Sequence, residues 1–178
     1  GKSFAAAIAM QNEGSVTSCD IHAHKVSLIE KGAARLGVSI VHARQADASQ
    51  FEPEFEAGFD VVIADVPCSG LGVIRKKPDI RYKDLAPMQK LPQVQAAILE
   101  NVSRYVKPGG VMVYSTCTVL KRENENVANA FLARHPEFRL EVFALPAGLD
   151  AQTDGMLTLY PHLHEADGFF ICKLRKNV

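Results

Sequence analysis

Two cysteines stand where a thiol could do chemistry. Cys68 lies three residues after Asp65 in the stretch ADVPCSG, and Cys117 lies in the stretch YSTCT. Each stretch follows an apolar run, so each thiol is predicted to lie just past the end of a buried strand. A thiolate is a strong nucleophile, and two neighbouring thiols can also form a redox pair. These residues alone leave open covalent catalysis, redox chemistry, and two cysteines that are simply buried, the commonest state of cysteine.

The apolar pattern predicts the elements that would position these residues. Strands are predicted at residues 15–21, 39–43, 59–64 and 111–115, with late strands at 139–143 and 169–174 that would pair antiparallel. Helices are predicted at residues 23–36, 92–106 and 123–134, the second of them ended by Lys107–Gly110. Strands that alternate with helices indicate an α/β fold with a largely parallel sheet.

Polar residues gather at the predicted carboxyl ends of the strands, where ligands bind in sheets of this kind. Asp20, Asp47, Asp65 and Cys117 all lie at or just past such ends. Asp20 would accept hydrogen bonds from a ribose diol, or would cap the helix that follows it. Asp47 would hold an adenine amino group, or would be a solvated loop acid. Together the four residues predict one site along this edge of the sheet.

The segment of residues 66–90 is rich in proline, glycine and basic residues, and it is predicted to be a long loop. Loops of this length in compact domains are often functional. Five cationic side chains and one tyrosine lie close together in it: Arg75, Lys76, Lys77, Arg81, Lys83 and Tyr82. The cluster predicts phosphate contacts beside the thiols, and a solvated loop explains it equally well.

Composition is typical of a globular protein and gives no sign of a polyanion-binding surface. The chain has 178 residues, of which 47% are hydrophobic, and its 20 Lys and Arg balance its 20 Asp and Glu. A nucleic-acid site would therefore be a local patch. No apolar run approaches the roughly 20 residues that span a membrane, and no leader is recognisable, so we expect a cytoplasmic protein without a membrane partner.

The cysteine spacing predicts neither a zinc site nor a disulfide framework. The sequence has no Cys-x-x-Cys pair, so no metal is expected. Cys19 and Cys172 lie in or beside apolar runs and are expected to be small core residues. This pattern fits a reducing compartment.

Five stretches, taken together, resemble a known family. They are ADVPCSGLGVIRKKPDIRY at 64–82, YSTCTVLKRENENV at 114–127, CDIHAHK at 19–25, KPGG at 107–110 and ADGFF at 166–170. The chain resembles the NOL1/NOP2/Sun family of RNA cytosine carbon-5 methyltransferases, especially its bacterial small-subunit rRNA members. The resemblance implies a Rossmann-like methyltransferase sheet that is mostly parallel with an antiparallel late strand. It also implies S-adenosylmethionine as cofactor, RNA (rRNA) as partner, and a monomer.

The same resemblance implies roles for individual residues. Cys117 would be the nucleophile, Cys68 would assist release of the methylated base, and Asp65 would hydrogen-bond the target cytosine near the methyl group. The cofactor would be bound by Gly1, Lys2, Asp20, Asp47, Asp65 and Pro67. The RNA would be held by Arg75, Lys76, Lys77, Arg81 and Tyr82.

The first residues depart from the family pattern. The chain begins GKSF at Gly1, whereas the family has a strand and a glycine-rich loop immediately before this point. We therefore expect residues 1–178 to be a methyltransferase catalytic domain that lacks its first strand and any separate RNA-binding domain. The strands that end at Asp20 and Asp65 would then each have an unpaired edge. Because part of the cofactor's loop would be absent, we expect residues 1–178 alone to bind S-adenosylmethionine weakly or not at all. A low-micromolar dissociation constant by calorimetry would contradict this.

Three other functions are open at this point. A non-catalytic RNA-binding or assembly module would have lost Cys117 or Asp65, and both are present. A DNA cytosine methyltransferase would use the thiol of the Pro-Cys pair as nucleophile and would not need the Thr-Cys thiol. A nicotinamide-dependent oxidoreductase would need a Gly-x-Gly-x-x-Gly loop after a strand, which the sequence does not contain.

Overall fold

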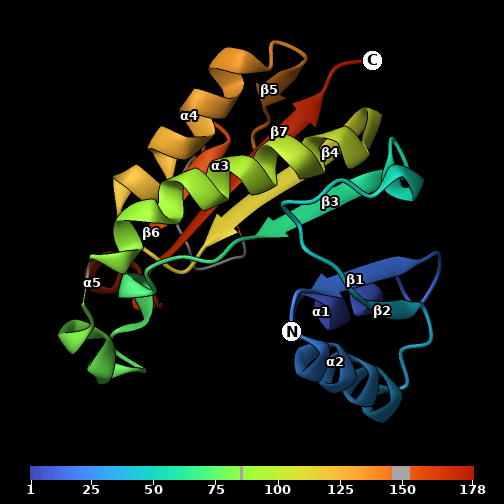
Figure 1. The fold of residues 1–178 in the computed structure, drawn as a ribbon, viewed down its shortest axis with the longest axis horizontal. Helices are drawn as coiled ribbons and strands as arrows, with labels where there is room; N and C mark the ends of the chain where they lie inside the picture. Colours follow the sequence, from blue (N-terminus) through green and yellow to red (C-terminus); the bar gives the residue numbers. More distant parts are fainter. Residues whose placement is uncertain (85, 146–152) are drawn as a thin grey trace. The chain divides into compact units, whose positions relative to one another are not determined.

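The computed structural model describes residues 1–84, 86–145 and 153–178. These residues form two compact units, residues 1–50 and 51–178 (Figure 1). Both units mix helices with strands, and the sheets contain parallel pairs and an antiparallel late strand. The α/β prediction is therefore confirmed.

The first unit is a small parallel βαβ arrangement preceded by a helix. Its elements are α1 (Lys2–Ala9), β1 (Val16–Asp20), α2 (Ala23–Leu36) and β2 (Val41–Gln45). The parallel pairing of β1 with β2 sets Asp20 opposite Gln45, so both strands end at the same edge. Helix α2 has the predicted bounds, and it stops at Gly37, whose φ of 67° suits glycine.

Two expectations for this unit were wrong. The second strand begins at Val41, two residues later than predicted. Cys19 is exposed rather than in the core. Side chains alternate along a strand, and here Ser18 takes the inward position, where its hydroxyl bonds to that of Ser3 in α1 at 2.7 Å. Cys19 therefore points to the opposite face of β1.

The second unit is built on a five-stranded mixed sheet. Its strands are β3 (Phe59–Asp65), β4 (Val106–Thr116), β5 (Phe138–Leu140), β6 (Met156–Leu159) and β7 (Phe169–Lys176). Its helices are α3 (Leu91–Val102), α4 (Glu125–Arg134) and α5 (Pro161–His164). Short 3-10 turns lie at Pro53–Phe55, Leu71–Val73, Pro78–Tyr82, Pro87–Lys90, Ser103–Tyr105 and Lys121–Glu123.

The order of strands is β3-β4-β7-β5, with β6 paired to β7. Strands β3 and β4 are parallel, and β7 runs antiparallel to β4, β5 and β6, which confirms the predicted late antiparallel pairing. Among the described residues, β3 pairs only with β4 and β1 pairs only with β2. The outward-facing Val61 and Ile63 of β3 are 55% and 45% exposed.

Helices α3 and α4 lie over one face of this sheet and enclose the main core (Figure 1). Leu99 of α3 and Phe131 of α4 pack with Met112, Phe170 and Leu174 of the strands, and all five side chains are fully buried. Cys172 is fully buried here, as expected. The core therefore fixes the strands whose carboxyl ends carry Asp65 and Cys117.

Strand β4 begins earlier than predicted. Residues 107–110, expected to end a helix, lie inside the strand as an irregularity, because Phe59 pairs with Val106 whereas Val61 pairs with Val111. Two features near Asp60 accompany this irregular pairing. The Lys107 ammonium binds the Asp60 carboxylate at 2.9 and 3.0 Å, and a Cβ on Gly110 would lie only 3.0 Å from the Asp60 carbonyl oxygen.

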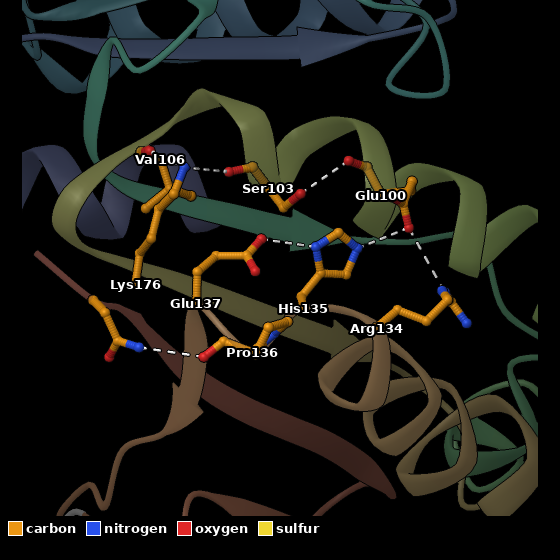
Figure 2. Close-up of polar contacts among 9 residues, drawn as sticks. Glu100, Ser103, Val106, Arg134, His135, Pro136, Glu137 and Lys176 are labelled. Carbon is orange, nitrogen blue, oxygen red and sulfur yellow. Dashed lines mark hydrogen bonds and ion pairs between the residues drawn. The ribbon is translucent and has the colours of Figure 1, made fainter.

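A polar cluster joins the C-terminal ends of α3, α4 and β7 (Figure 2). The two imidazole nitrogens of His135 bond to the carboxylates of Glu100 and Glu137, each at 2.9 Å. The Lys176 ammonium donates to the carbonyl oxygen of Val106 at 3.0 Å. Burial alone would lower the pKa of His135, but its hydrogen bonds to the two carboxylates outweigh burial and raise that pKa.

Candidate active site

Strands β3 and β4 bring the two predicted chemical stretches together. Asp65, the last residue of β3, is paired with Ser115 in β4, and its carboxylate accepts a hydrogen bond from the Ser115 hydroxyl at 3.0 Å. Because the strands are parallel, the loops that follow them leave from the same edge. Cys68 and Cys117 therefore emerge side by side, three and two residues beyond this pair.

The two thiols are in direct contact. Cys68 Sγ lies 2.9 Å from Cys117 Sγ, and the backbone N–H of Cys117 donates to Cys68 Sγ at 3.2 Å. Both side chains are half-buried. The hydrogen bond with Cys117 raises the pKa of the Cys68 thiol, and burial and the charge on Cys117 raise it further. Cys68 therefore stays protonated at neutral pH and can donate its proton in a hydrogen bond to the Cys117 sulfur.

Backbone contacts around Gly72 hold the loops next to the thiols. The Gly72 N–H donates to the carbonyl oxygen of Cys117 at 3.0 Å, and its own carbonyl accepts from the Gly168 N–H at 2.8 Å. A Cβ on Gly72 would lie 2.0 Å from the Gly168 oxygen, so only glycine fits. The loop after β3, the loop after β4 and the start of β7 thus meet at one point.

The basic segment begins directly after this point. Arg75, Lys76, Lys77, Arg81 and Tyr82 are all exposed, the tyrosine by 83%. Ile80 is 5% exposed and anchors the 3-10 turn Pro78–Tyr82. Lys76 pairs with Asp167 at 2.5 Å. The basic segment therefore exposes these four cationic side chains and one aromatic ring to solvent, while the buried Ile80 holds its backbone in place.

The other predicted cofactor residues lie in the first unit. Asp20 ends β1, where its carboxylate accepts from the His22 N–H at 2.9 Å and lies 3.4 Å from the Lys25 ammonium. It does not cap α2, whose N-cap is His22. Asp47 follows β2 and accepts from the backbone N–H and hydroxyl of Ser49, at 2.9 and 2.7 Å. The backbone hydrogen bond, and then the hydroxyl, lower the pKa of Asp47.

These residues fit a nucleoside-bearing cofactor. Two carboxylates at the ends of adjacent parallel strands match the acceptors that ribose and adenine need. Asp47 is held ionised, and both carboxylates are oriented by backbone N–H groups. Lys2 begins α1 and Gly1 is its N-cap, where positive charge and helix dipole favour an anionic group. Asp65 and Pro67 belong to the second unit.

Neither a metal-binding cluster nor a membrane-spanning helix is present among residues 1–84, 86–145 and 153–178. No three His, Cys, Asp or Glu side chains lie close enough there to hold a metal ion. None of the helices in these ranges has the length and apolar character needed to cross a membrane.

The described strands and helices have the Rossmann-like fold of methyltransferases, and a solved methyltransferase homolog protein from Pyrococcus horikoshii matches 99% of this chain with a TM-score of 0.79 and 28% identity. A family model described as 16S rRNA methyltransferase RsmB/F matches residues 1–175. The chain belongs to the RsmB/F family of 16S rRNA methyltransferases, which confirms the predicted family and cofactor.

Individual relatives agree. The chain is 45% identical over 184 residues to the probable ribosomal RNA small subunit methyltransferase B of Bacillus subtilis, covering 99% of this chain and 41% of that one. The crystal structure of PH0851 matches with a TM-score of 0.89 and 33% identity over 99% of this chain and 40% of that chain. NSun6 from Pyrococcus horikoshii with SFG matches with a TM-score of 0.81 and 29% identity over 99% and 45%. The chain thus spans about two fifths of the B. subtilis relative.

Proposed function

We propose that the protein containing this chain transfers a methyl group from S-adenosylmethionine to carbon 5 of a cytosine in small-subunit rRNA. The reaction would pass through a covalent bond between Cys117 and carbon 6 of the base. The observation that carries the proposal is the 2.9 Å contact between Cys68 and Cys117 beside Asp65, at the carboxyl ends of two parallel strands. This is the arrangement that a two-thiol covalent mechanism requires.

The first step explains the need for a nucleophile. Carbon 5 of cytosine is a poor nucleophile by itself. Addition of the Cys117 thiolate to carbon 6 makes the ring enamine-like, so that carbon 5 can take up an electrophilic methyl group. S-adenosylmethionine, when bound, supplies that methyl group. Asp65, held by Ser115 at 3.0 Å, would in its protonated form donate its proton to ring nitrogen 3, where the added thiolate places negative charge, and would take the proton back on elimination.

The second step explains the need for Cys68. Before reaction the pKa of Cys68 is raised chiefly by its hydrogen bond to the Cys117 sulfur. Once that sulfur is bound to carbon 6 it carries no charge and accepts hydrogen bonds poorly, so Cys117 no longer raises the pKa of Cys68, and only burial still does. A Cys68 thiol that gives up its proton to solvent in this state would be the base. The Cys68 thiolate would then take the proton from carbon 5, and elimination would restore the ring double bond and the Cys117 thiolate.

The basic segment would bind the RNA around the target base. The target base must leave its stack to reach the thiols, as in other enzymes that modify bases. Arg75, Lys77 and Arg81 would contact phosphates, and the exposed ring of Tyr82 would stack on a neighbouring base. Lys76 would contribute only if its pair with Asp167 opened.

One experiment separates this mechanism from its alternatives. Cys117→Ala and Cys68→Ala are made separately in the full-length protein and incubated with S-adenosylmethionine and 16S rRNA transcribed in vitro. Cys68→Ala is expected to accumulate a denaturant-resistant protein–RNA adduct, and Cys117→Ala is expected to give none. The reverse pattern would assign the attack to Cys68, as in the DNA cytosine methyltransferase alternative. Absence of methyl transfer by the unmodified protein would favour a non-catalytic RNA-binding or assembly module.

A further inference from the structure

Two buried polar residues form hydrogen bonds with the loops that carry the two thiols. Glu123 ends the 3-10 turn Lys121–Glu123, and Asn124 is the N-cap of α4; both are 0% exposed. Neither was singled out from the sequence. Their spacing carried a signal, because Asn124 lies four residues before the buried Ala128 and seven before the buried Phe131, on the inward face of α4.

Glu123 holds the loop that carries Cys68. Its Oε2 accepts from the backbone N–H of Ser69 at 2.8 Å and from Gln95 Nε2 at 3.2 Å. Gln95 Nε2 also donates to the carbonyl oxygen of Pro67 at 2.9 Å. The residues on both sides of Cys68 are therefore tied, directly or through one amide, to the same carboxylate.

Asn124 holds the loop that carries Cys117 in the same way. Its Oδ1 accepts from the Thr116 hydroxyl at 2.6 Å, and its Nδ2 donates to the carbonyl oxygen of Thr118 at 3.0 Å. The hydroxyls of Ser69 and Thr118 bond to each other at 2.8 Å and join the two loops. Adjacent residues of one turn thus fix the flanks of both cysteines.

The use of a carboxylate at this buried position needs an explanation. Glu123 Oε1 makes no hydrogen bond among the described residues, and both protein donors converge on Oε2. Burying a carboxylate without a cation costs stability, so stability alone does not account for this side chain. A charged acceptor does, however, bind a backbone N–H more strongly than a neutral one. The stronger hydrogen bond is made to the Ser69 N–H, so it holds the loop that carries Cys68 more firmly.

We infer that Glu123, supported by Asn124, is a positioning residue that sets Cys68 against Cys117 for reaction. It touches neither thiol and acts through the backbone of Ser69 and through Gln95. The inference rests on the proposed two-thiol reaction for its consequence in catalysis. Its structural half, that the carboxylate orders residues 65–73, stands apart from that reaction.

The test uses the full-length protein and three variants. Glu123→Ala removes the acceptor, Glu123→Gln keeps an oxygen for the Ser69 N–H, and Phe138→Leu is a stability-matched control in the core, away from the thiols. Hydrogen exchange over residues 65–73 reports the order of the Cys68 loop. Steady-state methylation of 16S rRNA transcribed in vitro gives kcat and KM.

Glu123→Ala is expected to lose exchange protection at residues 65–73 and to lower kcat about tenfold, with KM for RNA changed less than about twofold. Glu123→Gln keeps a neutral, weaker acceptor for the Ser69 N–H, so it is expected to lie between the unmodified protein and Glu123→Ala in both exchange protection and kcat. The inference is overturned if protection is unchanged in Glu123→Ala, if kcat is unchanged when protection is lost, or if Phe138→Leu with the same drop in Tm loses as much kcat.

Two provisions keep the test decisive. If Glu123→Ala does not fold, Gln95→Met removes the amide that links Glu123 to Pro67 while filling a similar volume. Gln95→Met is expected to lower both kcat and the exchange protection of residues 65–73, as expected for Glu123→Ala. If neither quantity changes, the inference is overturned. If the unmodified protein methylates no RNA, the proposed function fails, and the exchange of residues 65–73 alone decides whether Glu123 orders the loop.

Discussion

The carboxylate of Asp65 accepts a hydrogen bond from the hydroxyl of Ser115, 3.0 Å away, and the same two residues are partners across the parallel strands β3 and β4. The Asp65 carboxylate is thereby oriented by β4, the strand that ends one residue before Cys117. Asp65→Ala is expected to lower methyl transfer by roughly 100-fold or more. Ser115→Ala leaves the carboxylate present but less well oriented, so a smaller loss of about threefold to tenfold is expected. Transfer of labelled methyl to 16S rRNA measures both, and equal losses would contradict the division of roles.

The contact between Cys68 and Cys117 predicts sensitivity to oxidants. Their sulfurs lie 2.9 Å apart, so a small movement brings them to the roughly 2.05 Å of a disulfide. Treatment with diamide, a thiol oxidant, is expected to join them, abolish methyl transfer and be reversed by dithiothreitol. Peptide mass spectrometry locates the bond. Cys68→Ala is the control, and loss of activity without a bond between these two cysteines would argue against the prediction.

Gly72 predicts a strong steric effect. A Cβ at this residue would lie 2.0 Å from the Gly168 carbonyl oxygen, which is backbone and cannot rotate away. Gly72→Ala is therefore expected to lower the free energy of unfolding by about 2–3 kcal/mol. Urea denaturation measures the change. Gly1→Ala is the matched control, because a Cβ at Gly1 would meet nothing within 4 Å; equal stability of the two variants would refute the steric account.

The cluster around His135 predicts a pH-dependent contribution to stability. The pKa of His135 is raised above 6.5, so its contribution is fully present below that pH and is lost as pH rises through the folded pKa. The pKa of Glu137 is lowered: burial, the largest single influence, opposes this shift, but the hydrogen bonds to His135 and to the Glu137 backbone, with the charges on His135 and Lys176, together outweigh it. The contribution of Glu137 to stability is therefore lost in acid, below its ordinary 4.5. Glu100, Arg134 and Lys176 are the other charged groups at the cluster (Figure 2).

His135→Gln tests this window. The difference in unfolding free energy between the unmodified protein and the variant is expected to be larger at pH 5.5 than at pH 8.5. The His135 side chain forms ion pairs with the two carboxylates only when it is protonated, which is the state favoured at the lower pH. Urea denaturation at the two pH values gives the comparison. A difference that does not change with pH would show that His135 acts by packing on Phe131 alone, whose ring lies 4.2 Å away.

Local sequence signals predicted the elements that position the thiols. The helix at 23–36 has both its apolar spacing and its Gly37 stop in the sequence, and its bounds were correct. The neighbourhood of Cys68 and Cys117 follows from two adjacent parallel strands, each ending just before a cysteine. Such features depend on short-range patterns and on a general rule of sheet topology.

The errors come from contacts between distant residues. Residues 107–110 contain proline and two glycines, which favour a turn, yet β3 pairs with β4 on both sides of them, at Val106 and Val111, and this keeps them within the strand. Helix α1 and strand β6 were not predicted, since both are short and lack clear boundary signals. The buried position of Glu123 was missed because an acid near a helix start is normally exposed at the helix dipole; only its partners Ser69 and Gln95 make burial tolerable.

The meeting of Gly72 with Gly168 has one more consequence. The contact is made entirely by main chain, so it fixes the position of the loop without depending on any side chain that follows it. The exposed residues among 73–83 can therefore exchange their side chains while the sulfurs keep their spacing, and the buried Ile80 is the exception. In the proposed reaction, the exposed segment would choose the RNA and the thiols would form the new bond, so these two properties could diversify independently.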